Sequence, residues 1–293
     1  MKHKIWLYIL AITIVFLWGA TFVNTKVLYN AGLHPLDIFV IRFVIAYLCI
    51  WTISPRTLWA NSWHDELNMV WLGITGGSLY FLAENYAVGL SLVTNVSFLV
   101  CTAPLVTVIL GLAFVKSIKA SWKLILGSLV AVIGVGLVIF NGHFVLHLNP
   151  LGDFLALVAS FAWAIYSLLM KKISNQYSAI FITRKVFFYG LVTVLPIYLF
   201  EPWTTSWSML CEPKIWINLV FLGVIASFVC FLLWAWVIAK IGAMKASNLI
   251  YLNPVSTFVT SAIFLDEPIT IMSFLGSAFI LLGVSIANKA KGI

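Results

Sequence analysis

Apolar residues form long, uninterrupted runs along almost the whole chain, and short polar breaks separate them. Each run is about as long as the roughly 20 residues that a helix needs to cross the hydrocarbon core of a bilayer. The ten runs are Ile5–Val23, Leu36–Ile53, Leu67–Leu90, Val93–Val115, Trp122–Phe140, Leu151–Met170, Ala179–Phe200, Ile215–Ala239, Ala246–Leu265 and Ile271–Ala287. The pattern predicts an all-α membrane protein with ten transmembrane helices.

Lysine and arginine residues are distributed unevenly between alternate breaks. With the N-terminus placed in the cytoplasm, the outer segments hold only Lys26 and Lys214. The inner segments hold Lys2, Lys4, Arg56, Lys116, Lys119, Lys123, Lys171, Lys172, Lys240, Lys245, Lys289 and Lys291. Because cytoplasmic loops carry the excess of Lys and Arg, we predict a multi-pass protein of the inner (plasma) membrane with both termini cytoplasmic.

The composition agrees with this prediction. Of the 293 residues, 63% are hydrophobic and only 9% are charged, whereas a soluble domain carries about 25% charged residues. Ten spans use most of the chain, so no separate soluble domain is expected. The net charge of +8 is explained by the loop lysines, and nucleic acid is not expected as a partner.

The second half of the chain repeats the first. The stretch Phe39–Tyr47, which contains Arg42, corresponds to Phe181–Tyr189, which contains Arg184. Further equivalent pairs are Trp18 and Trp163, Pro104 and Pro254, Thr107 and Thr257, Gly127 and Gly276, and Gly134 and Gly283. The repeats are predicted to be residues 1–145 and 146–293, with five spans each. Because five is odd, the second repeat must be inserted upside down, and inverted repeats of this kind underlie alternating access in transporters.

The order of several short motifs resembles the drug/metabolite transporter superfamily, specifically its EamA-type members with two five-helix units. The motifs are Phe16–Phe22 in the first span, the Phe-x-x-Arg pattern of the second and seventh spans, Ala103–Leu105, Asn253–Val255 and Leu265–Pro268. Val115–Ile118 departs from the family's acidic closing motif in the first repeat. The resemblance implies a proton-coupled or facilitated carrier whose central cavity is lined mainly by spans one, three, four, six, eight and nine. It also implies that spans five and ten are peripheral.

Few ionisable groups lie within the spans, and each is a candidate for substrate binding or coupling because charge in the hydrocarbon core is costly. Glu84 is the acidic residue placed well inside a span, and Asn85 lies beside it. Arg42 lies at a depth equal to that of Glu84, so the two are expected to form a salt bridge if their helix faces meet. Arg42 and Arg184 are interpreted either as helix-joining residues or as anchors for a substrate carboxylate or phosphate. Lys185 is expected to extend to the cytoplasmic surface.

Proline, asparagine and aromatic residues give a second group of candidates. Pro104 and Pro254 each remove a backbone donor and are expected to kink their helices. Asn95 and Asn253 supply polar groups on the same two spans. The candidates for cavity walls are Trp18, Tyr80, Trp163, Tyr166, Trp234 and Tyr251.

These observations predict a secondary-active transporter, and the class preferred is an exporter of amino acids or related small metabolites. An organic-anion, sugar-phosphate or nucleotide-sugar exchanger is the alternative, because three cations in the spans outnumber Glu84. An intramembrane enzyme is a remote alternative, since clustered carboxylates and histidines are missing from the spans. No P-loop is present, so no ATP, metal or other cofactor is expected. The expected partners are a small-molecule substrate, the lipid bilayer and, for a coupled carrier, protons; the sequence does not indicate an oligomeric state.

Overall fold

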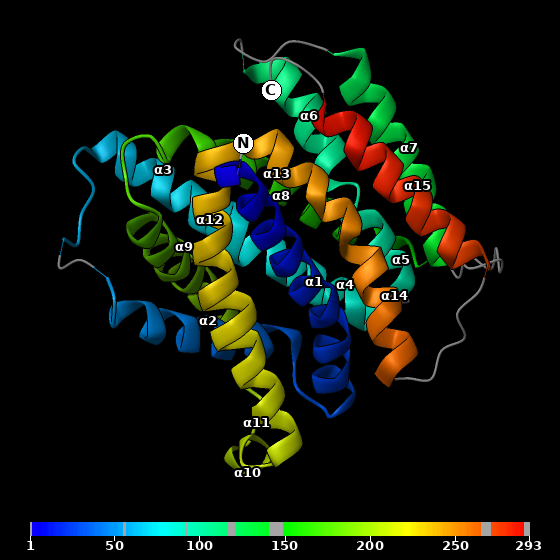
Figure 1. Cartoon of the computed structure of the whole chain (residues 1–293). Helices are drawn as coiled ribbons and strands as arrows, with labels where there is room; N and C mark the ends of the chain where they lie inside the picture. Colours follow the sequence, from blue (N-terminus) through cyan, green and yellow to red (C-terminus); the bar gives the residue numbers. More distant parts are fainter. Residues whose placement is uncertain are drawn as a thin grey trace.

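The computed structural model describes residues 2–54, 57–91, 93–115, 121–140, 149–264 and 271–289. Every regular element within these ranges is a helix (Figure 1). The first half contains α1 (Lys2–Asn30), α2 (Pro35–Trp51), α3 (Trp63–Gly73), η1 (Ile74–Ser78), α4 (Leu79–Leu90), α5 (Val93–Val100), α6 (Ala103–Phe114) and α7 (Trp122–Phe140). The second half contains α8 (Pro150–Ile173), α9 (Ala179–Val194), η2 (Leu195–Leu199), α10 (Trp207–Leu210), α11 (Pro213–Val220), η3 (Phe221–Val229), α12 (Cys230–Ile241), α13 (Ala243–Leu249), η4 (Ile250–Leu252), α14 (Asn253–Phe264) and α15 (Ile271–Asn288).

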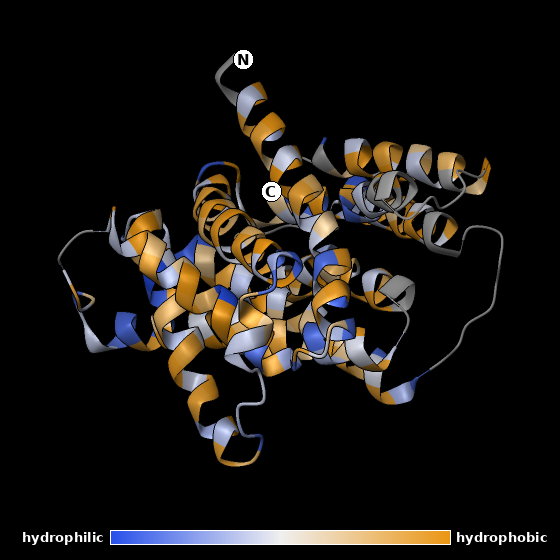
Figure 2. Cartoon of the chain, turned by 90° about the horizontal axis from the view of Figure 1, so that it is seen from below, coloured by the Kyte–Doolittle hydropathy of each residue, from blue (hydrophilic) through white to orange (hydrophobic). Residues whose placement is uncertain are grey.

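Five helical segments in the described part are long and apolar enough to cross a membrane. They are Ile5–Asn30, Val96–Phe114, Pro150–Ile173, Ala179–Leu199 and Pro213–Ile241, and the shorter apolar helices are Trp122–Leu137 and Phe274–Ala287. Apolar residues also cover much of the outside of the bundle (Figure 2). The prediction of an all-α, multi-pass membrane protein is confirmed, while the count of ten spans stays a prediction.

The first helix is longer than the apolar run predicted. It continues to Asn30, because the chain from Asn24 onward contains no helix breaker before Gly32. Gly32 has φ of +95°, a left-handed conformation that glycine adopts without steric cost. The Leu33 N–H donates to the Leu28 carbonyl at 3.1 Å, which is the bond that closes a Schellman motif at a helix end.

The third and eighth predicted spans each contain a π-helical segment. η1 interrupts α3 and α4, and η3 interrupts α11 and α12. The two segments occupy corresponding places in the two halves, since the constant offset of 150 residues maps Pro104 onto Pro254 and η1 into η3. π-helical turns are rare and occur frequently at functional sites.

The fourth and ninth predicted spans are also broken, in each case just before a proline. A turn at Cys101–Thr102 separates α5 from α6, in which Pro104 occupies the first turn. In the ninth span the 3₁₀ turn η4 precedes α14, in which Pro254 occupies the first turn. Each break lies where proline lacks the N–H that would continue the helix.

Helices from the two halves pack against each other in pairs. α3 packs on α9 while α2 packs on η3, and α1 packs on α14 while α6 packs on α8. Each of these contacts has a counterpart with the two halves exchanged. α7 and α15, one from each half, lie side by side away from α2 and α9 (Figure 1).

Glycines bring the backbones of α7 and α15 into close contact. A Cβ atom added to Gly283 would lie 2.4 Å from the Ala131 nitrogen, and one added to Gly127 would lie 2.4 Å from the Ala287 nitrogen. Small residues of this kind allow helices in a membrane to approach closely enough for van der Waals packing to hold them together. α7 and α15 contribute no residue to the cavity described below.

Candidate functional site

A small cavity lies inside the bundle where helices from both halves of the chain meet. Its lining residues are Trp18, Thr21, Phe22, Arg42, Tyr80, Phe81, Glu84, Val100, Ala103, Trp163, Phe231, Ile250 and Asn253. Each of the six spans named by the family resemblance contributes at least one of them, and α2 adds Arg42. The cavity volume is about 30 Å³, whereas roughly 10–15 Å³ is enough to hold one water molecule. The site therefore has room for very few water molecules.

Arg42 and Glu84 both face the cavity, but they do not form the expected salt bridge. Among the described residues, no nitrogen–oxygen pair within 4.0 Å joins them. Arg42 instead donates from Nε to the Ser227 hydroxyl at 3.0 Å, and its guanidinium lies 4.3 Å from the Phe81 ring centroid. The side chains are 2% and 7% exposed, so two opposite charges lie buried in one cavity without direct contact.

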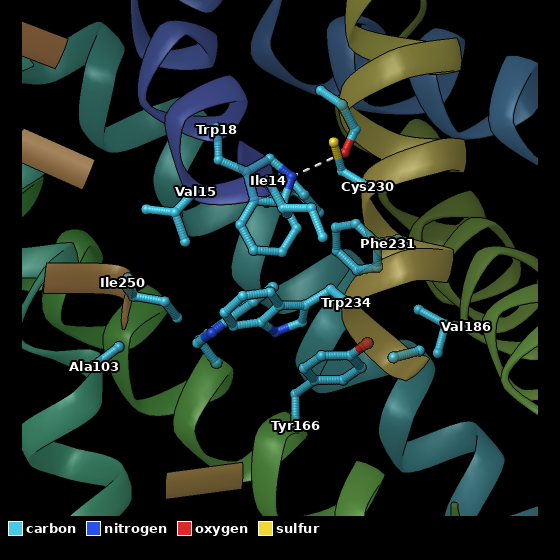
Figure 3. Close-up of a cluster of buried hydrophobic side chains, with 14 of the residues drawn as sticks. Ile14, Val15, Trp18, Ala103, Tyr166, Val186, Cys230, Phe231, Trp234 and Ile250 are labelled. Carbon is cyan, nitrogen blue, oxygen red and sulfur yellow. Dashed lines mark hydrogen bonds between the residues drawn. The ribbon is translucent and has the colours of Figure 1, made fainter. Parts of the chain in front are cut away.

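The cavity wall is mainly aromatic. The Trp18 ring contacts Trp163 edge-on at 5.3 Å and Trp234 at 5.0 Å between centroids. Its indole N–H donates to the Ala226 carbonyl of η3 at 2.9 Å, and Figure 3 draws this bond as a dashed line from the Trp18 ring. The bond fixes the Trp18 ring in place. Phe231 lies 5.8 Å from Trp18 and 5.7 Å from Trp163, which closes the aromatic wall.

Several predicted wall residues lie behind the cavity rather than at its surface. Trp234, Tyr166 and Tyr251 are at most 1% exposed and are not lining residues. Tyr166 packs where Gly76 of η1 leaves room, since a Cβ there would lie 2.2 Å from the tyrosine ring. Figure 3 shows Tyr166 and Trp234 beside Phe231, so they support the wall from behind.

The predicted asparagines have different surroundings. Asn253 lines the cavity, is 5% exposed, and its Oδ1 atom has no hydrogen-bond partner in the described part of the chain. Asn85 does not line the cavity; it donates to the Pro35 carbonyl at 3.1 Å and joins α4 to the start of α2. The side chain of Asn95 lies outside the described residues.

At one end of the bundle, which we call the Asp37 end, polar bonds tie the two halves together. Asp37 is 1% exposed. Its carboxylate accepts the Tyr198 hydroxyl at 2.9 Å, the Thr205 N–H at 3.0 Å and hydroxyl at 2.6 Å, and the Thr204 N–H at 3.2 Å. Tyr86 donates to Glu201. These bonds hold the segment after η2 against the start of α2.

At the opposite end of the bundle, which we call the Glu66 end, a second buried carboxylate also joins the two halves. Glu66 is ion-paired with Lys185, accepts the Tyr189 hydroxyl, and accepts the Ala60 N–H at 2.7 Å. The expectation that Lys185 extends to the surface is therefore wrong: the residue is 4% exposed, and a buried carboxylate compensates its charge.

Arg184 also belongs to the Glu66 end and does not line the cavity. It donates to the Ser54 hydroxyl at 2.7 Å and to the Thr57 carbonyl. Its guanidinium lies 5.0 Å from the Trp51 ring centroid. Arg184 thus joins α9 to the chain that follows α2.

A surface-lying tyrosine completes the Glu66 end. Tyr177 donates its hydroxyl to Asp65 at 2.9 Å and accepts the Asn61 N–H at 2.8 Å. Desolvation and the bond to Asp65 raise the pKa of Tyr177 above its ordinary value. The hydroxyl therefore stays protonated at neutral pH and remains a donor.

Asp37 and Glu66 were not among the predicted site residues. Each lies in the first turn of its helix, where acidic residues are common because they complement the helix dipole. No pattern in the sequence indicates that either carboxylate is buried, although each stands within one residue of the end of a predicted span.

Two comparisons bear on what this arrangement does. The model of the EamA-like transporter family matches residues 5–140 and 150–289. The chain belongs to the EamA-like transporter family. The two matches cover two successive copies of the family unit, one in each half of this EamA-like chain.

Relatives of this EamA-like chain are also described as transporters. An uncharacterised transporter of Archaeoglobus fulgidus is 29% identical and aligns over 98% of this chain and 100% of that protein. A probable amino-acid metabolite efflux pump of Escherichia coli is 26% identical over 95% of this chain and 93% of that protein. A probable terminal-alkyne amino-acid exporter of Streptantibioticus cattleyicolor is 23% identical over 76% of this chain and 74% of that protein.

A solved crystal structure has the same fold. It matches with a TM-score of 0.76 over 96% of each chain at 17% sequence identity. Because the identity is low, this match shows the fold alone. Together with the family, the relatives show that this protein is a multi-pass membrane transporter and not an enzyme.

Proposed function

We propose that this transporter is a secondary-active exporter of amino acids or related small metabolites, working by alternating access around the central cavity. The observation that carries the proposal is a buried cavity in which Arg42 and Glu84 present opposite charges without pairing. An amphoteric substrate has one group for each of them. Relatives described as amino-acid metabolite efflux pumps support this choice.

The charge of the cavity argues against the organic-anion alternative. Arg184 and Lys185, whose positive charges favoured that alternative, lie at the Glu66 end and not in the cavity. One arginine and one glutamate leave the cavity with no net charge when both are ionised. A phosphorylated sugar or a nucleotide sugar would carry two or more negative charges and would find one cation.

Two repeats, residues 1–145 and 146–293, are proposed to exchange roles during transport. The exchanged packing pairs, the matching π segments and the matching proline breaks support two equivalent units. The Asp37 end and the Glu66 end are the two places where polar bonds would alternately open. The Lys and Arg distribution supports ten spans and cytoplasmic termini in the inner membrane.

Glu84 is proposed to bind the substrate amine and, in a proton-coupled cycle, to carry the proton. Everted vesicles that contain the protein should accumulate amino acids in preference to phosphorylated sugars. The Glu84→Gln variant should lose transport, or its dependence on pH, while reaching the membrane at the normal level. Glu212→Gln, which changes an exposed loop carboxylate, is the matched control. Full, pH-dependent transport by Glu84→Gln would refute this role.

A further inference from the structure

The hydrogen-bonding groups of the cavity that have no partner indicate which chemical groups its ligand carries. Arg42 uses Nε for Ser227, and among the described residues its two terminal nitrogens make no hydrogen bond. A guanidinium offers a planar fork that matches a carboxylate. Ser227 and the Phe81 ring hold the guanidinium from two sides, so the fork is oriented in advance.

Two further polar atoms at the cavity wall have no partner in the described part of the chain. They are Oδ1 of Asn253, an acceptor on α14, and Nε1 of Trp163, a donor on α8. The two residues are 5% and 4% exposed. Buried polar groups without a partner are costly, so their presence at one cavity indicates that a bound molecule pairs with them. The acceptor Asn253 and the carboxylate Glu84 together suit an ammonium group, which has three donors.

The remaining residues of the cavity wall limit which substrate side chain can bind beside the carboxylate and the ammonium group. Trp18, Phe81 and Phe231 supply apolar surface, and Arg42 and Glu84 are the only charged residues among the lining set of the described chain. A charged substrate side chain would therefore be buried without a partner, which is strongly unfavourable. An apolar side chain would lose no hydrogen bond to water on entering.

We infer, on the basis of the proposed function, that the site binds a zwitterionic α-amino acid with a neutral, apolar side chain. The carboxylate lies on Arg42, the ammonium group on Glu84 and Asn253, and the side chain on the aromatic wall. The free volume of about 30 Å³ does not admit such a molecule, so binding requires the helices around Trp18 to move apart.

The test uses purified protein in proteoliposomes that exchange radiolabelled L-leucine. Competitors are leucine itself, 3-methylbutylamine, which lacks the carboxylate, and 4-methylpentanoate, which lacks the amine. L-lysine, L-aspartate and L-serine test the side-chain limit. Leucine should compete at least about tenfold better than each of the other compounds, because each loses one charge-assisted bond or buries an unpaired group. Thermal stabilisation of the unaltered protein by the same compounds should give the same order.

Two variants test which residue binds the substrate carboxylate and which binds the substrate amine. Arg42→Gln should weaken competition by leucine about tenfold to a hundredfold and leave competition by 3-methylbutylamine unchanged. Because Glu84→Gln is expected to lose transport, it is compared by thermal stabilisation: stabilisation by leucine should weaken similarly, and stabilisation by 4-methylpentanoate should be unchanged. Equal losses for leucine and for both analogues would overturn the charge assignment. Equal exchange of leucine, serine and lysine would overturn the side-chain limit and leave the proposed function standing. If no amino acid is exchanged or stabilises the protein, the proposed function itself fails.

Discussion

The buried pair Glu66–Lys185 gives a sharp test of how the Glu66 end is held together. The two side chains are 6% and 5% exposed. In Glu66→Gln, the Lys185 ammonium would stay buried without its counter-charge. Breaking one partner of a buried pair typically costs about 3–5 kcal/mol. At 1.4 kcal/mol for each factor of ten, the ratio of unfolded to folded protein should rise by a factor of roughly a hundred to a few thousand.

The double variant Glu66→Gln with Lys185→Met separates the charge from the other bonds of Glu66. It removes both charges, and the glutamine oxygen can still accept from Tyr189 or Ala60, so the remaining cost should be about 1–2 kcal/mol. The double variant should therefore be more stable than Glu66→Gln alone. Asp65→Asn, one residue earlier and only half-buried, is the control and should cost less than about 1 kcal/mol.

The measurement is unfolding in mixed micelles with increasing dodecyl sulfate, followed by the fluorescence of the 13 tryptophans. Each variant is compared with the unaltered protein at one lipid-to-detergent ratio. The reasoning is refuted if Glu66→Gln is as stable as Asp65→Asn. It is also refuted if adding Lys185→Met makes Glu66→Gln less stable, because the charge would then not be the source of the cost.

Four further predictions test other parts of the fold. Asp37→Asn should cost about 2–4 kcal/mol, because an amide nitrogen would face the N–H donors that the carboxylate accepts; unchanged unfolding would contradict this. Gly283→Leu should cost about 3 kcal/mol by forcing α7 and α15 apart, whereas Leu282→Ala, at a side chain 58% exposed, should cost little; equal effects would refute the packing argument. Cys211, which is exposed, should react with a thiol reagent well before the buried Cys101, as measured by intact mass. Reporters fused after successive predicted spans should lie alternately outside and inside the cell. A C-terminus outside the cell would contradict the ten-span topology.

Depth along a span could be predicted from the sequence, but rotation about the span could not. Counting residues from the predicted ends placed Arg42 and Glu84 at equal depth, and the structure puts both at one cavity. Whether they touch depends on how α2 and α4 are rotated and on competing partners. Ser227, which is far away in sequence, accepts the hydrogen bond from Arg42 Nε. No periodic pattern in the sequence predicts this contact.

The internal repeat identifies residues at equivalent positions in the two halves. Residues at equivalent positions nevertheless make different contacts. Arg184 corresponds to Arg42, yet it lies at the Glu66 end and bonds to Ser54. The position equivalent to Glu84 is Trp234, so the second repeat offers Arg184 no matching carboxylate there. The π segments could not be predicted either: η1 consists mainly of glycine and small polar residues whereas η3 is mostly apolar, so the two segments share no sequence pattern that would mark them.

The bond from the Trp18 indole to the Ala226 carbonyl has a consequence for genetics. The acceptor is a main-chain atom, so replacing the side chain at position 226 leaves it in place. A scan of single substitutions would register the loss of Trp18 and give no signal at its partner. Position 226 is therefore expected to accept other small residues without loss of this bond. Covariation between the two positions is therefore expected to be weak, although they are in direct contact.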